Sequence, residues 1–366
     1  MVRVTEISLL DRVLLLGPPG IGKTEIVRAL ARKEAEKLGK KFVDLTGEIG
    51  DEMVEKVRAD PQNHYLFLRV VAPTVFPEEL GFPRERGNGL IDIIPPKKLY
   101  LLTLQGVHGV LFIDEVTNVQ LEAQISMFFS LIQEKEFGWG IKLSPNVKVV
   151  LAGNTPEWSE IVRALPKPLR ARMTIANVEP PTVKEWGAYM EKTYGDSWEK
   201  LALAYLTVNA DELIKPPSDD WSNFPCPRNW TELAIQLHEL KKNGASEDFI
   251  EEVIIGRLGR EVGTKFAAFL RERLTPEEME KLAQRPETFF ELSVSKRILT
   301  VYALANAPLE DLLSKYDALV EFIVQRDSEL FVLMLRMMEG RRRLEYAKKK
   351  MGLIRRVADD LRDLLV

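Results

Sequence analysis

The feature that most constrains this chain is a glycine loop of eight residues, Gly17-Pro18-Pro19-Gly20-Ile21-Gly22-Lys23-Thr24. The loop follows a short apolar run at 13–16, and it precedes a stretch at 23–38 whose apolar residues recur every three or four positions. This order predicts a buried strand, a tight loop and a helix, which is the context that the pattern G-x-x-x-x-G-K-[ST] requires. Glycines let backbone N–H groups converge on phosphate oxygens, and the start of a helix adds partial positive charge. We therefore expect the loop to bind a nucleotide, with Lys23 at the β- and γ-phosphates and the Thr24 hydroxyl in a Mg²⁺ shell.

Length and composition indicate a globular chain with several folded parts. The 366 residues have a mass of 41.7 kDa, with 45% hydrophobic and 29% charged residues and a mean hydropathy of −0.12. These values exclude a disordered or fibrous protein. No segment reaches the roughly 18 to 20 apolar residues of a membrane span, and the first residues lack the order of a signal peptide. We expect a cytoplasmic location.

The net charge and the metal-binding residue types limit the kinds of site that this chain can form. The single cysteine, Cys226, excludes an intrachain disulfide and a cysteine-built zinc or iron–sulfur site. His64, His108 and His238 are not at metal-ligand spacing, so a divalent ion is expected to arrive with a substrate. The net charge of −4, from 51 basic and 55 acidic residues, gives no overall attraction to nucleic acid or anionic lipid.

The predicted secondary structure changes after Pro180-Pro181. A double proline cannot continue a helix or a central strand, so it marks a boundary between two parts of the chain. Before it, apolar runs predict strands at 65–71, 109–113 and 147–152, with helices at 48–59 and 118–134. Alternating strands and helices predict a parallel α/β sheet. After it, the helical period dominates, at 182–194, 196–209, 229–242, 246–258, 261–273, 275–284, 295–306, 309–325, 328–338 and 341–365.

Two adjacent acids follow the strand at 109–113, namely Asp114 and Glu115. α/β sheets bind ligands at the carboxyl ends of their strands. Beside the glycine loop, Asp114 is placed to hold Mg²⁺ through water, and Glu115 to orient and polarise an attacking water. We therefore expect nucleotide hydrolysis in addition to binding.

Several further motifs stand in a recognisable order with these two. They are Gly153-Asn154-Thr155-Pro156, which close a later strand, Pro168-Leu169-Arg170-Ala171-Arg172 and Pro227-Arg228-Asn229-Trp230. In order and spacing, the set resembles the AAA+ ATPases over residues 10–306, with the greatest likeness to the MoxR-type branch. Phe76–Pro83 and Ile94–Leu99 look like the segment inserted around the second helix of that branch. Val262–Leu270 looks like the lid of members that act with von Willebrand factor A partners.

The resemblance implies a fold and a function. The fold is an α/β P-loop NTPase core with a parallel sheet at 1–180, followed by an all-α lid at 181–290 and a C-terminal helical extension at 291–366. The function is hydrolysis of ATP with Mg²⁺ by a ring of six subunits, which remodels a protein partner. That partner could contain a von Willebrand factor A domain.

The resemblance also assigns roles to three further residues. Asn154 matches a polar side chain that hydrogen-bonds the γ-phosphate or the attacking water. Arg172 matches an arginine finger that reaches the nucleotide of the neighbouring subunit, although Met173 replaces the usual aromatic residue and Arg170 is a competing choice. Arg228 matches the arginine of the lid that senses nucleotide, although Cys226 replaces the more usual serine.

Two segments leave alternatives open. The loop at 137–141, with Trp139 between glycines, fits either a pore-facing grip on a polypeptide or an ordinary β-turn packed on its own domain. The basic run at 341–356 lies on a predicted helix whose apolar seam includes Leu344, Met351 and Ile354. Such a helix docks on its own domain or contacts a partner or nucleic acid.

Two other functions remain to be weighed against remodelling. One is a nucleic-acid motor or clamp that uses the basic C-terminal run, against which the acidic net charge counts. The other is a nucleotide-controlled binding module with little turnover, against which Glu115 counts because a switch does not need an acid that positions water. The base preference, ATP or GTP, does not follow from these motifs.

Overall fold

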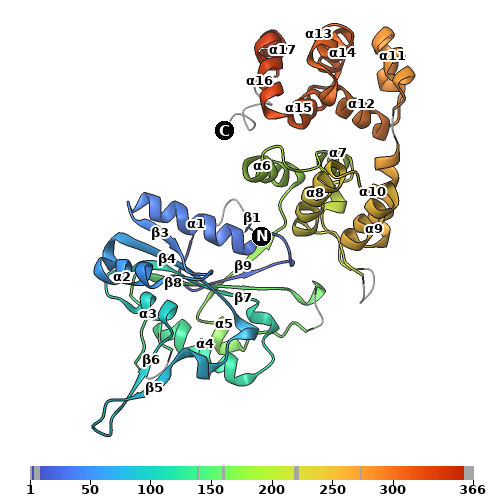
Figure 1. Ribbon diagram of the computed structural model, residues 1–366. Coiled ribbons are helices and arrows are strands. Elements are labelled where there is room, and N and C mark those ends of the chain that lie inside the picture. Colours follow the sequence, from blue (N-terminus) through green and yellow to red (C-terminus); the bar gives the residue numbers. More distant parts are fainter. Residues whose placement is uncertain are drawn as a thin grey trace. The chain divides into compact units, whose positions relative to one another are not determined.

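The computed structural model describes residues 2–3, 9–137, 140–158, 161–217, 222–272 and 274–357. The chain divides into two compact units, residues 1–180 and 181–366 (Figure 1). Each unit has its own cluster of buried hydrophobic residues. The predicted further division near residue 290 stays a prediction.

The first unit is built on a parallel sheet, as the alternation of strands and helices predicts. In the described part of the chain the sheet has seven strands in the order β1-β9-β2-β8-β7-β4-β3. Their bounds are Val2–Arg3 (β1), Val13–Leu16 (β2), Lys41–Asp44 (β3), His64–Val71 (β4), His108–Asp114 (β7), Val147–Gly153 (β8) and Thr174–Glu179 (β9). The sheet therefore confirms the α/β fold class and four predicted strands, β2, β4, β7 and β8, while β1, β3 and β9 are strands that the apolar pattern does not reveal.

Helices cover both faces of this sheet (Figure 1). They are α1 (Lys23–Lys37), α2 (Asp51–Ala59), α3 (Lys97–Thr103), α4 (Glu122–Glu134) and α5 (Lys167–Arg170), with 3₁₀ turns that include η3 (Ala72–Thr74), η4 (Pro77–Leu80), η5 (Val116–Asn118) and η6 (Pro156–Trp158). Successive strand residues such as Leu14 and Leu15 are both buried, because alternate side chains enter opposite layers. An antiparallel hairpin, β5 (Phe82–Glu85) with β6 (Ile91–Ile94), is separate from the main sheet.

The strand register brings the ends of four strands to one edge. Leu16 of β2 pairs with Gly153 of β8, and Val71 of β4 pairs with Asp114 of β7. β7 and β8 are themselves paired, so the segments that follow β2, β7 and β8 are neighbours. This edge positions the predicted nucleotide residues.

The second unit is helical throughout its described residues. Its helices are α6 (Val183–Tyr194), α7 (Leu201–Val208), α8 (Pro227–Lys242), α9 (Glu247–Leu258), α10 (Arg260–Arg271), α11 (Pro276–Gln284), α12 (Val294–Asn306), α13 (Leu309–Leu313), α14 (Asp317–Arg326), α15 (Ser328–Met337), α16 (Gly340–Lys349) and α17 (Met351–Arg356), with 3₁₀ turns η7 (Ala210–Leu213) and η8 (Pro286–Glu291). In neither unit is a described helix both long enough and apolar enough to cross a bilayer.

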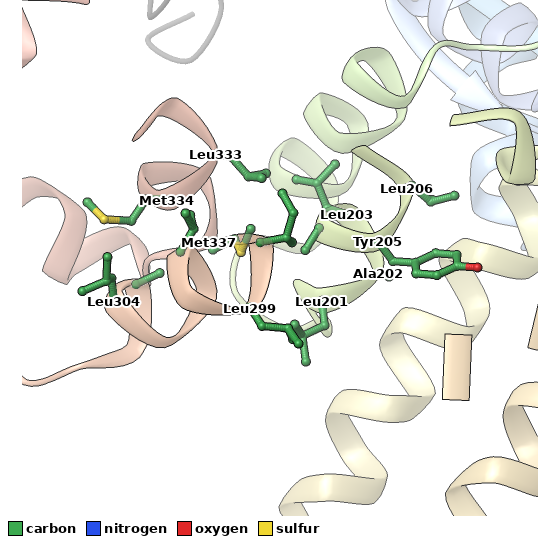
Figure 2. Close-up of a cluster of buried hydrophobic side chains, with 14 of the residues drawn as sticks. Leu201, Ala202, Leu203, Tyr205, Leu206, Leu299, Leu304, Leu333, Met334 and Met337 are labelled. Carbon is green, nitrogen blue, oxygen red and sulfur yellow. The ribbon is translucent and has the colours of Figure 1, made fainter. Parts of the chain in front are cut away.

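One hydrophobic core joins the early and late helices of this unit. Leu201 and Leu203 of α7 lie near Leu299 of α12 and Met337 of α15 (Figure 2). All four side chains are buried. The helices after residue 290 therefore pack directly on those before it.

Two helices predicted as continuous are each broken. The predicted helix at 309–325 forms α13 and α14, and the predicted helix at 341–365 forms α16 and α17 within its described part. The second break lies at Lys350, whose ammonium group pairs with Asp317 and lies 3.6 Å from Glu321. The break changes the face that is buried, so the prediction of a seam through Leu344 and Met351 was wrong, and Tyr346, Leu353 and Val357 are buried instead.

Substitution of Leu304 by alanine is expected to lower the free energy of unfolding by about 2–5 kcal/mol, because the side chain is fully buried and its loss leaves a cavity. Leu344, which is 61% exposed in the same unit, is the matched control, and its substitution by alanine is expected to cost less than about 0.5 kcal/mol. Urea unfolding followed by circular dichroism measures both. Equal effects at the two positions would contradict the described core.

Candidate functional site

The glycine loop takes a backbone shape that few other residues adopt. Gly20 and Gly22 have φ angles of +73° and +90°, which glycine reaches without strain. A Cβ atom at Gly17 would lie 2.6 Å from the carbonyl oxygen of Val178, so this position also requires glycine. The loop ends at the first turn of α1, where unpaired backbone N–H groups favour an anion.

Lys23 connects the loop to the end of β8. Its ammonium group donates to the carbonyl oxygens of Gly17 and Pro18, both at 2.8 Å, and to Oδ1 of Asn154 at 3.1 Å. The lysine is 8% exposed. Two residues separated by 131 positions, both predicted to face the γ-phosphate, thus lie in contact.

Thr24 and Asp114 meet across the same edge. The Thr24 hydroxyl donates to Oδ2 of Asp114 at 2.9 Å. Asp114 is 7% exposed, and its Oδ1 accepts the N–H of Glu115 at 3.0 Å. The hydroxyl and carboxylate predicted to share a metal shell are therefore neighbours.

Glu115 turns away from the line of its strand. Its φ of +57° lies in the left-handed region, which is uncommon for a residue other than glycine and marks functional sites more often than chance. The chain then enters η5, where the Thr117 hydroxyl accepts the backbone N–H of Asn154 at 2.9 Å. This turn gives two adjacent carboxylates different surroundings, one buried and bonded and the other half-buried.

The residues at this edge fit a magnesium ion that arrives with a nucleotide. Mg²⁺ prefers hard oxygen ligands and is held in proteins by one or two side chains together with phosphates and waters. Thr24 and Asp114 supply such oxygens at the carboxyl edge of the sheet. Over the described residues there is no group of three or more His, Cys, Asp or Glu side chains that could hold a metal independently.

Arg69 of β4 is a site residue that the sequence analysis did not identify. Its Nε and Nη2 atoms lie 2.9 and 2.8 Å from Oδ2 of Asp114. A signal was present, because Arg69 is the one charged residue in the otherwise apolar run at 65–71. A charge in a central strand needs a partner.

The two finger candidates lie on the surface. Arg170 ends the short helix α5, and Arg172 follows it. Both are exposed, and Nη1 of Arg172 donates to the carbonyl oxygen of Pro168 at 2.6 Å. An exposed arginine is available to another molecule, and which of the two serves stays a prediction.

Arg228 belongs to the second unit, in the first turn of α8, and its position relative to the nucleotide loop stays a prediction. The turn itself is firmly held. Asn229 donates to the carbonyl oxygen of Phe224 at 2.8 Å, and Trp230 Nε1 donates to that of Glu212 at 2.9 Å. Pro227 occupies the first helical position, where the lack of an N–H costs nothing.

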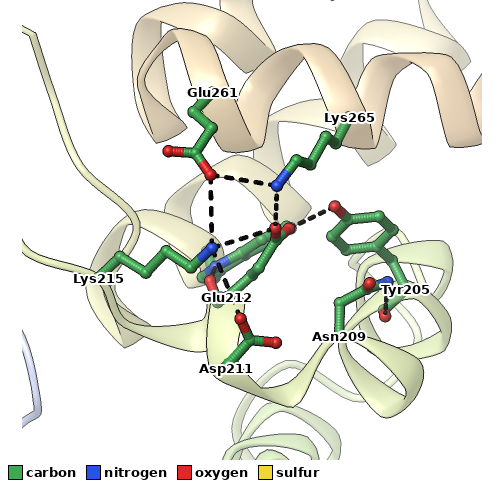
Figure 3. A network of polar contacts seen from close by, with 8 residues as sticks. Tyr205, Asn209, Asp211, Glu212, Lys215, Glu261 and Lys265 are labelled. Carbon is green, nitrogen blue, oxygen red and sulfur yellow. Dashed lines mark hydrogen bonds and ion pairs between the residues drawn. The ribbon is translucent and has the colours of Figure 1, made fainter. Parts of the chain in front are cut away.

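The Glu212 side chain is the centre of a polar network in this unit (Figure 3). The buried carboxylate accepts hydrogen bonds from the Tyr205 hydroxyl and, at 2.9 Å, from the ammonium group of Lys265. Lys215 lies 3.3 Å from it, and Glu261 lies 3.1 Å from Lys265. Burial raises the pKa of Tyr205, and Glu212 raises it further, so the phenol stays a donor. The segment 262–270, which carries part of the sequence resemblance, is thereby fixed to η7.

The loop at 137–141 forms a hairpin at its base. Glu136 bridges Lys142, and the Phe137 N–H donates to the carbonyl oxygen of Ile141 at 3.0 Å. Gly138 and Trp139 lie outside the described residues, so both interpretations of this loop stay open.

Comparison with known proteins agrees with this site. The family described as "ATPase family associated with various cellular activities (AAA)" matches residues 13–178. This span contains the glycine loop, both acids, Asn154 and Arg172, and the match supports an ATP-hydrolysing enzyme. A comparison with curated proteins gave no match.

Solved structures show more distant likeness. Cdc6p of Pyrobaculum aerophilum has 15% identity and a TM-score of 0.37, covering 96% of this chain and 88% of its own. AMPPCP-bound DnaA of Aquifex aeolicus has 13% identity and a TM-score of 0.33, covering 98% and 87%. The RuvB Holliday junction branch migration motor of Thermotoga maritima has 18% identity and a TM-score of 0.27, covering 87% and 80%. At these scores the likeness carries no argument about function.

The Cys226 thiol, which precedes the first turn of α8, is expected to resist alkylation. Burial raises its pKa above the ordinary 9.0, against the opposing effect of N–H groups at the start of α8 and of Arg228. Because the thiolate is the reactive form, iodoacetamide at pH 8 should modify the folded protein at least about tenfold more slowly than the urea-unfolded chain. The alkylation rate of the folded protein should rise as the pH is raised above 8, because the thiolate fraction grows. Mass spectrometry reads the single cysteine directly, and equal rates in the two states would contradict its burial.

Proposed function

We propose that this chain, whose residues 13–178 form an ATPase domain of the AAA family, is a Mg²⁺-dependent ring ATPase of the MoxR type that remodels a protein partner. The observation that carries the proposal is the junction at the sheet edge, where Lys23 contacts Asn154 and Thr24 contacts Asp114. Four residues from three separate segments meet there, and each has the chemistry that phosphoryl transfer requires.

In this proposal the chain's own residues bind, orient and polarise. The backbone N–H groups of residues 20–24 and the Lys23 ammonium bind the phosphates, and Thr24 with Asp114 would hold the metal. When bound there, Mg²⁺ would supply positive charge to the phosphate oxygens. Glu115 accepts a proton from the attacking water and orients it, and Asn154 hydrogen-bonds the γ-phosphate or that water. Arg172 of one subunit, and Arg228 of the second unit, complete the set of charges around the γ-phosphate.

Two features support a ring with a protein as its partner. Arg172 is exposed and so suits a role at a subunit interface. The β5–β6 hairpin exposes apolar side chains, with Phe82 57% and Ile91 65% exposed. Exposed apolar side chains of this kind are typical of protein-contact surfaces. A von Willebrand factor A domain is the partner that the sequence resemblance suggests, and six subunits are the assembly it suggests.

One observation favours nucleic-acid contact as a second candidate. Arg341, Lys348, Lys349, Arg355 and Arg356 are exposed along α16 and α17. They form a local basic surface on a chain whose net charge is −4. We rank this candidate second because the basic surface is short and the rest of the chain is acidic.

Glu115→Gln is expected to slow ATP turnover by at least about 100-fold and to leave nucleotide affinity within a few-fold, since the amide cannot accept a proton from water. Lys23→Ala is expected to lose nucleotide affinity itself. Glu36→Gln, an exposed acid on α1, is the matched control and should behave as the wild type. Phosphate release and binding of a fluorescent ATP analogue measure the two quantities. Full turnover in both site variants would refute the proposed site.

Mixing two inactive variants tests whether Arg172 acts on a neighbouring subunit. Arg172→Ala keeps its own nucleotide loop, and Lys23→Ala keeps its own arginine, so a mixed ring contains complete sites and should regain turnover that neither variant has alone. Arg170→Ala in place of Arg172→Ala is the control for the neighbouring arginine. Light scattering of Glu115→Gln with Mg-ATP should give about six times the 41.7 kDa chain mass. Activity that is not restored in a mixture of that mass would exclude action across the interface.

A further inference from the structure

Arg69 forms an ion pair with the carboxylate that the proposed function assigns to Mg²⁺, that of Asp114. The Nε and Nη2 atoms of Arg69 lie 2.9 and 2.8 Å from Oδ2 of Asp114. The arginine comes from β4, the strand paired with β7, and not from any segment of the glycine loop. This pairing has no part in the mechanism above.

The donors around Asp114 leave neither oxygen without a partner. Oδ2 accepts the Thr24 hydroxyl as well as the Arg69 guanidinium, and Oδ1 accepts the Glu115 N–H. The Asp114 side chain is only 10% exposed, and a carboxylate with so little water needs a counter-charge. Arg69 supplies such a charge, with Nη2 2.8 Å from Oδ2.

A metal ion that binds beside Thr24 meets this same carboxylate. A guanidinium on Oδ2 repels a divalent cation at close range, and it uses the lone pairs that water molecules of the metal shell would otherwise bind. The two cations therefore compete for one carboxylate.

We propose that Arg69 is a positioning residue that serves as the resident counter-cation of Asp114 and sets the metal affinity of the site by competing with Mg²⁺. This inference rests on the proposed assignment of Thr24 and Asp114 to the metal. Arg69 keeps Asp114 aligned with Thr24 and withdraws from Oδ2 as the metal enters with the nucleotide.

The surroundings of Arg69 allow this withdrawal without movement of its strand. The arginine side chain is 30% exposed, three times the fraction of its partner, so its guanidinium borders solvent. The backbone beyond β4 is held, because the Gln124 amide group donates to the carbonyl oxygens of Pro73 and Val75 at 3.2 and 2.9 Å. A rotation of the side chain alone is therefore sufficient to move the guanidinium away from Oδ2.

The test measures Mn²⁺ binding by electron paramagnetic resonance to the full chain saturated with an ATP analogue that carries a methylene between the β- and γ-phosphates. Arg69→Gln removes the charge and keeps a hydrogen-bond donor, while Arg69→Lys keeps the charge. We expect Arg69→Gln to bind Mn²⁺ about tenfold more tightly than the wild type, with Arg69→Lys within about threefold of it. Arg28→Gln is the matched control, because Arg28 Nε donates to Oδ2 of Asp44 at 2.9 Å in the same unit, and it should leave Mn²⁺ affinity unchanged.

A second readout is the thermal stability of the protein. Without metal or nucleotide, Arg69→Gln should unfold at a lower temperature than the wild type, because Asp114 loses its counter-charge. Addition of Mg²⁺ together with the same ATP analogue should restore more stability to this variant than to the wild type. If Arg69→Gln does not fold, Arg69→Met is measured in its place against Arg69→Lys.

The outcomes separate this inference from the proposed function. Equal Mn²⁺ affinity in the neutral variant and the lysine variant, or weaker binding in the neutral one, would overturn the role of Arg69 while the metal site stands. A wild type that binds no more Mn²⁺ than the analogue does in free solution would overturn the metal assignment itself.

Discussion

The hydrogen bond between Thr24 and Asp114 is the contact on which the proposed site depends. It joins the first turn of α1 to the end of β7, across 90 residues of sequence. Neither residue is placed by local structure alone. The parallel order β2-β8-β7 brings the strand ends to one edge, and the left-handed glycines let the loop reach back to it. Lys23, Asn154 and Arg69 each contact this pair or its immediate neighbours.

Burial explains why this edge is densely hydrogen-bonded. Lys23 and Asp114 are among the few charged residues with little exposure, and charged groups in such surroundings are stable only when paired or bonded. The lysine is held by backbone carbonyl oxygens, and the aspartate by three donors from separate segments. This arrangement fixes the side chains before a ligand enters, which reduces the cost of ordering them on binding.

The sequence was sufficient for the parts of the site that lie within one motif. The glycine loop, the strand before it and the acids after β7 follow from local patterns, and the α/β fold follows from their alternation. Arg69 could not be assigned in this way, because its partner is set by the register of β4 against β7, over a separation of 45 residues. The short strand β3 was missed because its exposed Lys41 and half-buried Asp44 give no continuous apolar run. The break at Lys350 was missed because its partners, Asp317 and Glu321, lie on a different helix.

In the helical unit as well, a buried charged side chain is held by partners from several segments. A buried Glu212 costs stability relative to an apolar residue of similar size, unless its partners are all in place. Here the partners come from α7, from the segment after η7 and from α10, while Trp230 of α8 bonds the Glu212 backbone (Figure 3). These contacts are satisfied together only in one arrangement of the four segments, so they specify geometry more than they add stability. The first turn of α8 is thereby fixed within its unit, while Arg228 stays exposed on it.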